Sequence, residues 1–339
     1  MTKSCTEMEA RTSSAEAIRA AWSRRPSNAV ARLGGRPLFV LSMRDLLQAA
    51  ARARVLLVAL VAPAPAAIAG FARAARDAGA PLLLVRPCGS AEEEGPEEMR
   101  DDAAFVEAVF RAAQEVSFAG PLALIKDPPR AGCAVPDQER VRREIDAGFT
   151  GLSLAAEDSQ VGARDAALAA SAVCQLELGL EIVPLGGARA AAELARQLRS
   201  RGATPSAVRL TGLEDEAGAL LEELSGTSVS SATEALADKL LSLHAQQLVA
   251  AGPFLRALQR SAPPEVWDSL QGWGDEKGAS LEQAAARHQR LLRDLPAAAQ
   301  DRLEALSCYE ALDLFDKAGA RQSGARLLAA LGALHPGEP

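Results

Sequence analysis

Charged side chains stand at the ends of two apolar runs near the middle of the chain. Lys126 and Asp127 close the run PLALIKD, and Glu157 lies near the end of the run GLSLAAED. Two strand-like runs joined by one helical segment are typical of a βαβ unit, and the loops after barrel strands carry the active site. A lysine there can form an imine with a carbonyl compound, and a carboxylate can move a proton. The pattern therefore predicts catalytic candidates at this edge of a sheet.

Each of these two neighbouring candidates has a second interpretation. Lys126 and Asp127 point to opposite faces of a strand, so only one of them can face the centre of a barrel. Lys126 can become an imine-forming nucleophile only if desolvation lowers its pKa, and a solvated surface lysine is the alternative. Asp127 can be an acid or base, but an aspartate before Pro128 is also a common way to end a strand.

The next apolar run, LEIVPLGG, offers a carboxylate and a pair of glycines. Glu181 is a candidate metal ligand, although one carboxylate without histidines makes a poor site for a transition metal. Gly186 and Gly187 can bring a phosphate close to bare backbone amides, or they can simply end a strand and start a helix. Both interpretations of the glycine pair predict a loop at the same edge of the sheet.

Apolar runs alternate with helical segments along most of the chain. The runs at 55–63 and 81–87 lack the polar alternation of half-exposed strands, as expected for strands that are covered on both faces, and the run at 227–232 is weaker. This order predicts an α/β fold, either a TIM-like (β/α) barrel or a doubly wound sheet. An eighth run is not visible, so two alternatives stay open: a complete barrel, and one that is incomplete or degenerate. The seven predicted strands lie at 55–63, 81–87, 121–127, 151–158, 180–187, 206–212 and 227–232.

Composition divides the chain into three predicted parts. Residues 1–35 are rich in Ser, Thr, Ala and Arg and predict a flexible arm. Residues 36–235 hold the predicted barrel, in which Ser42 is placed to cap the first helix. Residues 236–339 predict an all-helical C-terminal extension that packs on the barrel or on a partner.

Charge and cysteine usage exclude several classes of protein. A net charge of −7 and a pI near 5.3 argue against a nucleic-acid surface. The five cysteines form no CxxC pair, so neither a zinc knuckle nor a disulfide framework is indicated. No apolar run is long enough to cross a bilayer, and we expect a cytoplasmic protein without membrane contact.

Several segments resemble the class II, metal-dependent ketose-bisphosphate aldolases. The similar segments are PLFVLSMRDLLQAA, EIDAGFTGLSL and SAVRLTGLEDEAGALLEELSGTSVSSATEAL. Two others, FVEAVFRAAQEVSFAGPLALIKDPPRAG and LGLEIVPLGG, look more like the tagatose-bisphosphate aldolase subunit that is described as non-catalytic. The resemblance implies a barrel in which a divalent metal, held mainly by histidines, polarises the ketose oxygen.

The residues that the resemblance implies are only partly present. Asp127 matches the acid/base of the family's Asp-His pair, but Pro128 replaces the histidine. Gly212 is what remains of a His-Gly-Gly stretch that binds metal and phosphate, and Thr233 loosely matches a substrate-binding Asn-x-x-Thr-Asp motif. Glu181 matches a strand-five glutamate of the non-catalytic subunit in one register, and a different register puts Val183 there instead. The chain's histidines lie outside the predicted barrel strands, at His244, His288 and His335.

Missing metal ligands favour a degenerate, non-catalytic aldolase-like barrel that acts as a companion subunit or scaffold in carbohydrate metabolism. The expected partners are further copies of the chain or another protein, bound through the C-terminal helices. Two alternatives stay open. The first is an active carbon–carbon lyase that uses Lys126 as a Schiff base, or an acidic site for zinc or another divalent metal. The second is a module that binds or senses a sugar phosphate. No cofactor is expected unless the lyase alternative holds.

Overall fold

All strands of the protein belong to one parallel sheet in the part of the chain that the structure describes. The computed structural model describes residues 18–19, 21–88, 96–128, 138–156, 173, 177–184, 187–210, 228–231 and 245–333. The strands are β1 (Phe39–Val40), β2 (Leu57–Val61), β3 (Leu82–Arg86), β4 (Pro121–Lys126), β5 (Gly151–Ala156), β6 (Gly179–Pro184), β7 (Ala207–Leu210), β8 (Ser228–Ser231) and β9 (Ala245–Ala250).

The strands β2 to β9 close into a ring. The strand order is β1-β4-β3-β2-β9-β8-β7-β6-β5, and β4 also pairs with β5, which closes the ring and leaves β1 as an additional strand. Every pairing is parallel, and each barrel strand neighbours the one before it in sequence. The short strand β1 lies outside the ring, beside the start of β4. The predicted (β/α) barrel is therefore confirmed.

One expectation about the barrel is wrong. The chain after Glu234 was expected to be entirely helical, but Ala245–Ala250 forms β9, the strand that closes the ring between β2 and β8. Two glutamines, Gln246 and Gln247, interrupt the apolar pattern of this segment and hide its strand character. The barrel therefore extends beyond residue 235, and the helical C-terminal region begins at Gly252.

Alternating side chains divide the barrel strands between two cores. Leu57, Ala59 and Val61 of β2 belong to a cluster inside the ring, whereas Val58 and Leu60 pack against the surrounding helices. Helix α3 (Met43–Ala53) belongs to the inner cluster and contacts β4, β6 and β9, so it covers the end at which the strands begin. The side chain of Ser42 accepts a hydrogen bond from the backbone of Asp45, as predicted for the cap of this helix. With that end closed, the other end of the barrel is where a site can open.

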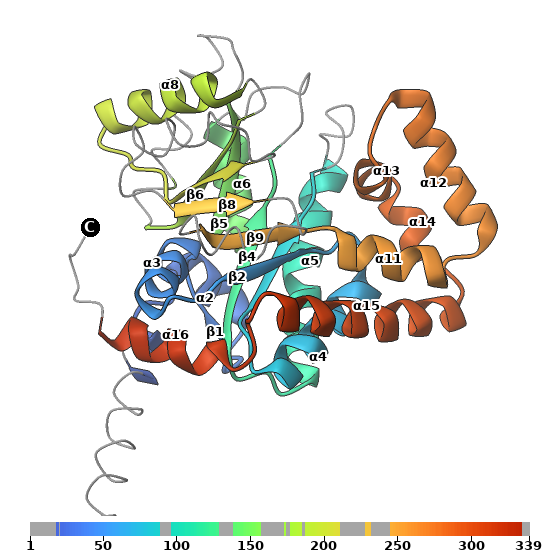
Figure 1. Cartoon of the computed structure of the whole chain (residues 1–339), viewed down its shortest axis with the longest axis horizontal. Coiled ribbons are helices and arrows are strands. Elements are labelled where there is room, and N and C mark those ends of the chain that lie inside the picture. Colours follow the sequence, from blue (N-terminus) through green and yellow to red (C-terminus); the bar gives the residue numbers. More distant parts are fainter. Residues whose placement is uncertain are drawn as a thin grey trace, which may run out of the picture.

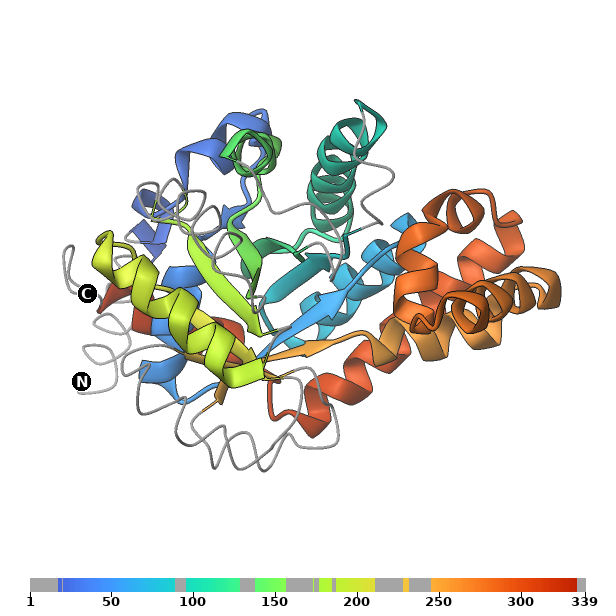
Figure 2. The same ribbon diagram turned by 90° about the horizontal axis from the view of Figure 1, so that it is seen from above.

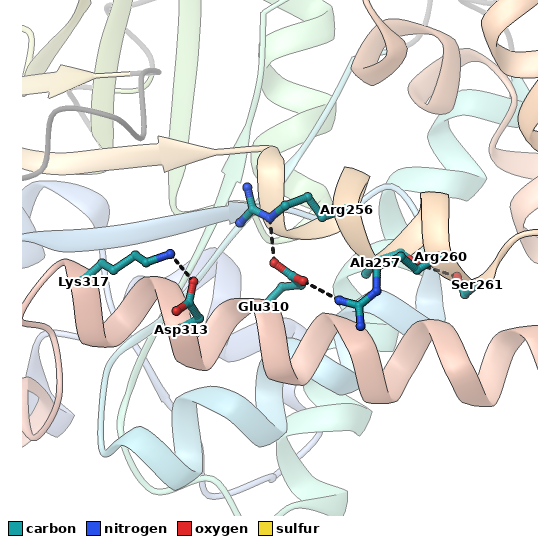
Figure 3. Close-up of polar contacts among 7 residues, drawn as sticks. All are labelled: Arg256, Ala257, Arg260, Ser261, Glu310, Asp313 and Lys317. Carbon is teal, nitrogen blue, oxygen red and sulfur yellow. Dashed lines mark hydrogen bonds and ion pairs between the residues drawn. The ribbon is translucent and has the colours of Figure 1, made fainter.

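Helices form the outer layer of the barrel and the C-terminal region. Helix α15 packs along α4 and α11, whereas α12, α13 and α14 extend away from the barrel (Figures 1 and 2). Arg256 and Arg260 on α11 both contact the carboxylate of Glu310 on α15, at 2.6 and 2.9 Å (Figure 3). The helices are α2 (Ser27–Leu33), α4 (Pro65–Ala78), α5 (Pro96–Glu115), α6 (Gln138–Ala147), α8 (Gly187–Ser200), α11 (Gly252–Ser261), α12 (Pro264–Lys277), α13 (Leu281–Arg287), α14 (Gln289–Arg293), α15 (Ala297–Lys317) and α16 (Ser323–Gly332).

A search of the described helices finds none that combines the length and the apolar character needed to span a bilayer.

Candidate functional site

Four polar side chains from neighbouring strands meet inside the barrel. Asp127 directly follows β4, Ser153 lies on β5, Glu181 on β6 and Arg209 on β7. The register places Ser153 beside Glu181, and all four side chains are buried. Because they alternate with residues of the outer core, such as Leu152, they face the centre of the ring.

The guanidinium of Arg209 holds this group together. Its Nη2 atom lies 2.8 Å from Oδ1 of Asp127 and 2.5 Å from Oε2 of Glu181, and its Nε atom donates to the same glutamate oxygen at 3.1 Å. Ser153 donates its hydroxyl to Oε2 of Glu181 at 2.8 Å and accepts from Nη2 of Arg209 at 3.3 Å. One cation therefore ties together β4, β5, β6 and β7.

The group contains one cation, Arg209, and two carboxylates, those of Asp127 and Glu181. Burial alone would lower the pKa of Arg209, but the carboxylates of Asp127 and Glu181 raise it well above its ordinary value. Arg209 is therefore a permanent cation beside two carboxylates. The second oxygen of Glu181, Oε1, is buried and has no hydrogen-bond partner. Oδ1 of Asp127 also has no hydrogen-bond partner, although it lies 2.8 Å from Nη2 of Arg209 as an ion pair.

Lys126 lies on the other face of the same strand, outside the ring. It is 1% exposed, and its Nζ atom donates to Oδ1 of Asp102 on α5 at 2.8 Å. Arg86, the register partner of Lys126 on β3, contacts the same oxygen. Arg140 and Glu144 on α6 form an ion pair at 3.1 Å, and the nearby charges of Lys126 and Asp102 act on the pKa of Glu144. As alternation requires, only Asp127 of the two neighbouring candidates faces the barrel centre.

The environment of Lys126 does not favour an imine-forming role for this residue. Burial, the largest single influence, would lower the pKa of Lys126, but Asp102, Cys88 and Glu144 together outweigh it and the pKa is raised. A raised pKa keeps the amine protonated, and a protonated amine cannot attack a carbonyl group. Lys126 also faces the helical layer instead of the barrel centre. It is best interpreted as a structural cation.

Of the predicted phosphate-binding and substrate-binding residues, only Gly187 lies in the part of the chain that the structure describes. Gly187 is the first residue of helix α8, which follows β6 as expected. Gly186, Gly212, Thr233 and Glu157 lie outside the described residues, as do two of the three histidines. The third, His288, lies in the C-terminal helices, with its ring 5.5 Å from that of Trp273. The candidate phosphate site therefore stays a prediction.

Two residues of the barrel interior were missed from the sequence. Arg209 stands in the run SAVRLTG, and a charged residue in an otherwise buried strand is a signal that was available. Gln247 on β9 is completely buried, and neither atom of its amide group has a hydrogen-bond partner. Its strand was not recognised, so its position inside the barrel could not be predicted.

Comparison with known proteins finds similarity in structure only. No protein-family model matches the chain, and no curated protein matches its sequence. The YdjI aldolase from Escherichia coli K12 gives a TM-score of 0.58 at 12% identity, over 84% of this chain and 99% of that chain. This chain has an aldolase-like barrel fold. A fructose-bisphosphate aldolase from Campylobacter jejuni gives 0.56 at 11% identity, over 84% and 96%. A protein described as a putative fructose-1,6-biphosphate aldolase from Coccidioides immitis gives 0.54 at 12%, over 83% and 96%.

The polar residues that the structure describes in this barrel do not fit the divalent metal that the resemblance to metal-dependent aldolases implies. Transition-metal sites need several nitrogen, sulfur or oxygen donors around one point, and histidines dominate the catalytic ones. Among the described residues, no group of three or more His, Cys, Asp or Glu side chains is arranged to hold a metal ion. Glu181, the predicted metal candidate, already accepts from Arg209 and Ser153 through Oε2. We therefore derive no metal-dependent step for this aldolase-like barrel.

Proposed function

We propose that this aldolase-like barrel does not catalyse aldol cleavage and instead acts as a companion subunit or scaffold. The observation that carries the proposal is the contact of Arg209 with both carboxylates at the barrel centre. A base or metal ligand must offer a lone pair to substrate or metal, whereas Asp127 and Glu181 direct oxygen atoms at a fixed guanidinium. The outward position of Lys126 removes the residue that an imine mechanism would need.

The C-terminal helices provide the proposed contact surface. Helices α12, α13 and α14 extend from the barrel (Figure 2), and they carry partly buried tryptophans, Trp267 and Trp273. Trp side chains are enriched in protein interfaces because they bury a large apolar area. We propose that this projecting part binds another copy of the chain or a catalytically complete aldolase subunit in the cytoplasm.

A cleavage assay tests the non-catalytic part of the proposal. The purified full chain is incubated with ketose mono- and bisphosphates, with and without added Zn²⁺, and aldehyde release is followed. We expect no turnover above the protein-free rate and no adduct after borohydride treatment. Turnover that depends on bound zinc, or a reduced imine on Lys126, would refute it.

A reconstitution assay tests the companion role. The chain is mixed with a catalytically complete, metal-dependent aldolase from the same cell, and complex size and turnover are measured. We expect a stable complex with raised activity or thermal stability of the catalytic subunit. If the full chain forms neither a complex nor an oligomer at micromolar concentration, the companion role is wrong.

A further inference from the structure

We propose that Asp127, Ser153 and Glu181 form a cation-binding site at the centre of the barrel, and that the guanidinium of Arg209 is its built-in occupant in place of a divalent metal. The inference rests on buried contacts, and it does not require that the chain be inactive. It assigns a role to Arg209 and names the class of cation, a planar guanidinium, that the site accepts.

The first argument is the number and origin of the contacts. The acceptors come from three different strands, and all three reach the same Nη2 atom, at 2.8, 2.5 and 3.3 Å. The Nε atom adds a fourth contact, at 3.1 Å, to Glu181. Convergence of oxygen atoms from separate strands on one positive group is the arrangement of a bound ion. Here the ion is attached to β7 by its own side chain.

The second argument is electrostatic. Buried carboxylates are costly unless a positive charge or hydrogen-bond donors neutralise them. Asp127 and Glu181 are 8% and 2% exposed, and Arg209, 6% exposed, is the cation that contacts both. A guanidinium stays charged at every physiological pH and presents several donors in a fixed plane. The barrel therefore keeps its neutralising cation without depending on metal supply.

The third argument is that a divalent ion and Arg209 cannot share these oxygens. A metal would have to bind within about 2.2 Å of atoms that already contact Nη2, so like charges would be forced together. Two oxygens make no hydrogen bond: Oε1 of Glu181, and Oδ1 of Asp127, which meets Arg209 as an ion pair. Two oxygens are too few to hold zinc, which takes four ligands. The site is therefore selective for the organic cation.

Thermal unfolding of the full chain with added cations tests the inference. For the unaltered protein, Zn²⁺, Mn²⁺ or EDTA should leave the Tm unchanged. Arg209→Ala leaves two buried carboxylates without their cation, so its Tm should fall by at least about 6 °C. Millimolar guanidinium or methylguanidinium should then raise the Tm of Arg209→Ala in a saturable way, because a ligand of the native state stabilises it. Urea at the same concentrations should not.

Arg196→Ala provides the matched control. Arg196 lies on α8 and pairs with Glu193 at 2.7 Å, but both side chains are largely exposed. Its loss should lower the Tm by no more than about 2 °C, and guanidinium should give no saturable gain. Rescue of both variants to the same extent would mean a general solvent effect and would overturn the inference.

A charge-neutral variant covers the case in which Arg209→Ala does not fold. Arg209→Met combined with Asp127→Asn and Glu181→Gln removes the cation together with the charges it neutralises. We expect this triple variant to fold and to have a higher Tm than Arg209→Met alone. The inference is wrong if the triple variant is the less stable of the two, or if the unaltered chain binds one Zn²⁺ that Glu181→Gln abolishes. Aldol turnover without such a metal would refute the proposed function and leave this inference standing.

Discussion

One carboxylate oxygen of Asp102 contacts two buried cations. Lys126 and Arg86 both contact Oδ1 of Asp102, and all three side chains are less than a tenth exposed. Breaking a buried ion pair by removing one partner usually costs about 3–5 kcal/mol, because the remaining charge stays buried without compensation. We therefore expect Asp102→Asn to lower the free energy of unfolding by about 3–5 kcal/mol, measured by urea denaturation.

Asp313→Asn is the control for this prediction. Asp313 pairs with Lys317 one turn later on α15, at 2.5 Å, and both side chains are exposed (Figure 3). Exposed pairs of this kind contribute about 0.3–0.5 kcal/mol, so this variant should stay close to the unaltered protein. Equal losses in the two variants would show that Asp102 is not a buried counter-ion.

Glu144 gives the stability of the protein a specific dependence on pH. Burial raises the pKa of Glu144, and the nearby cations Lys126 and Arg140 offset this effect only in part. A carboxyl group with a raised pKa in the folded state binds more protons there than in the unfolded chain. Its contribution to stability is therefore complete below the unfolded value, about 4.3, and is lost as the pH rises through the folded pKa.

Glu144→Gln should remove this dependence. We expect the free energy of unfolding of Glu144→Gln, relative to the unaltered protein, to increase as the pH is raised from about 4 to 7. Urea unfolding at several pH values measures this difference, and Glu193→Gln on α8 is the exposed control. A relative stability that stays constant or decreases over this range would contradict the assignment.

The strand β9 was not predicted because two of its residues are polar glutamines. Most of the seven predicted barrel strands are mainly apolar, although β8 reads SVSS, whereas β9 reads AQQLVA and has a glutamine that faces the interior. A buried amide without a partner costs about 1–3 kcal/mol. We expect Gln247→Met, which keeps the shape and removes the polar atoms, to raise the free energy of unfolding by about 1 kcal/mol or more.

The neighbouring glutamine tests the same idea from the other face of β9. Gln246 is only half-buried and has a polar contact, so Gln246→Met should give no gain. Chemical denaturation of the two variants under identical conditions compares them directly. A stabilising Gln246→Met with a destabilising Gln247→Met would mean that Gln247 has a partner, such as a ligand or an ordered water molecule.

The covered end of the barrel depends on close approach between α3 and the first residues of β5 and β6. A Cβ atom added at Gly179 would collide with Cβ of Met43 and come within 2.8 Å of the backbone nitrogen of Arg44. Gly179→Ala should therefore lose about 1–3 kcal/mol in urea denaturation. Gly272→Ala, on the exposed face of α12 with open space around it, should gain about 0.5–1 kcal/mol. The opposite order would mean that α3 is not seated against the strands.

At the scale of the whole molecule, the sequence predicted the barrel better than its site. Apolar periodicity is local, so it located the strands and the helices between them. The contacts of Arg209 join residues far apart in the chain, from Asp127 to Glu181, and no local pattern reports such a meeting. The opposite orientations of Lys126 and Asp127 were predictable from alternation, but which of them faces the centre depended on the closed ring.

The C-terminal region consists of two parts that should respond differently to deletion. Helix α15 packs along α4 and α11, so close to α4 that a Cβ added at Gly70 would collide with the backbone of α15. Deleting residues 297–339 would expose the outer core around Phe71, and we expect that chain not to fold cooperatively.

Helices α11 and α15 run in opposite directions (Figure 3), so a short Gly/Ser linker can replace residues 264–295. That chain should keep a cooperative urea transition while losing oligomer or partner binding, as measured by light scattering. If it keeps full association, the contact surface lies elsewhere on the barrel, because the projecting helices were the proposed site.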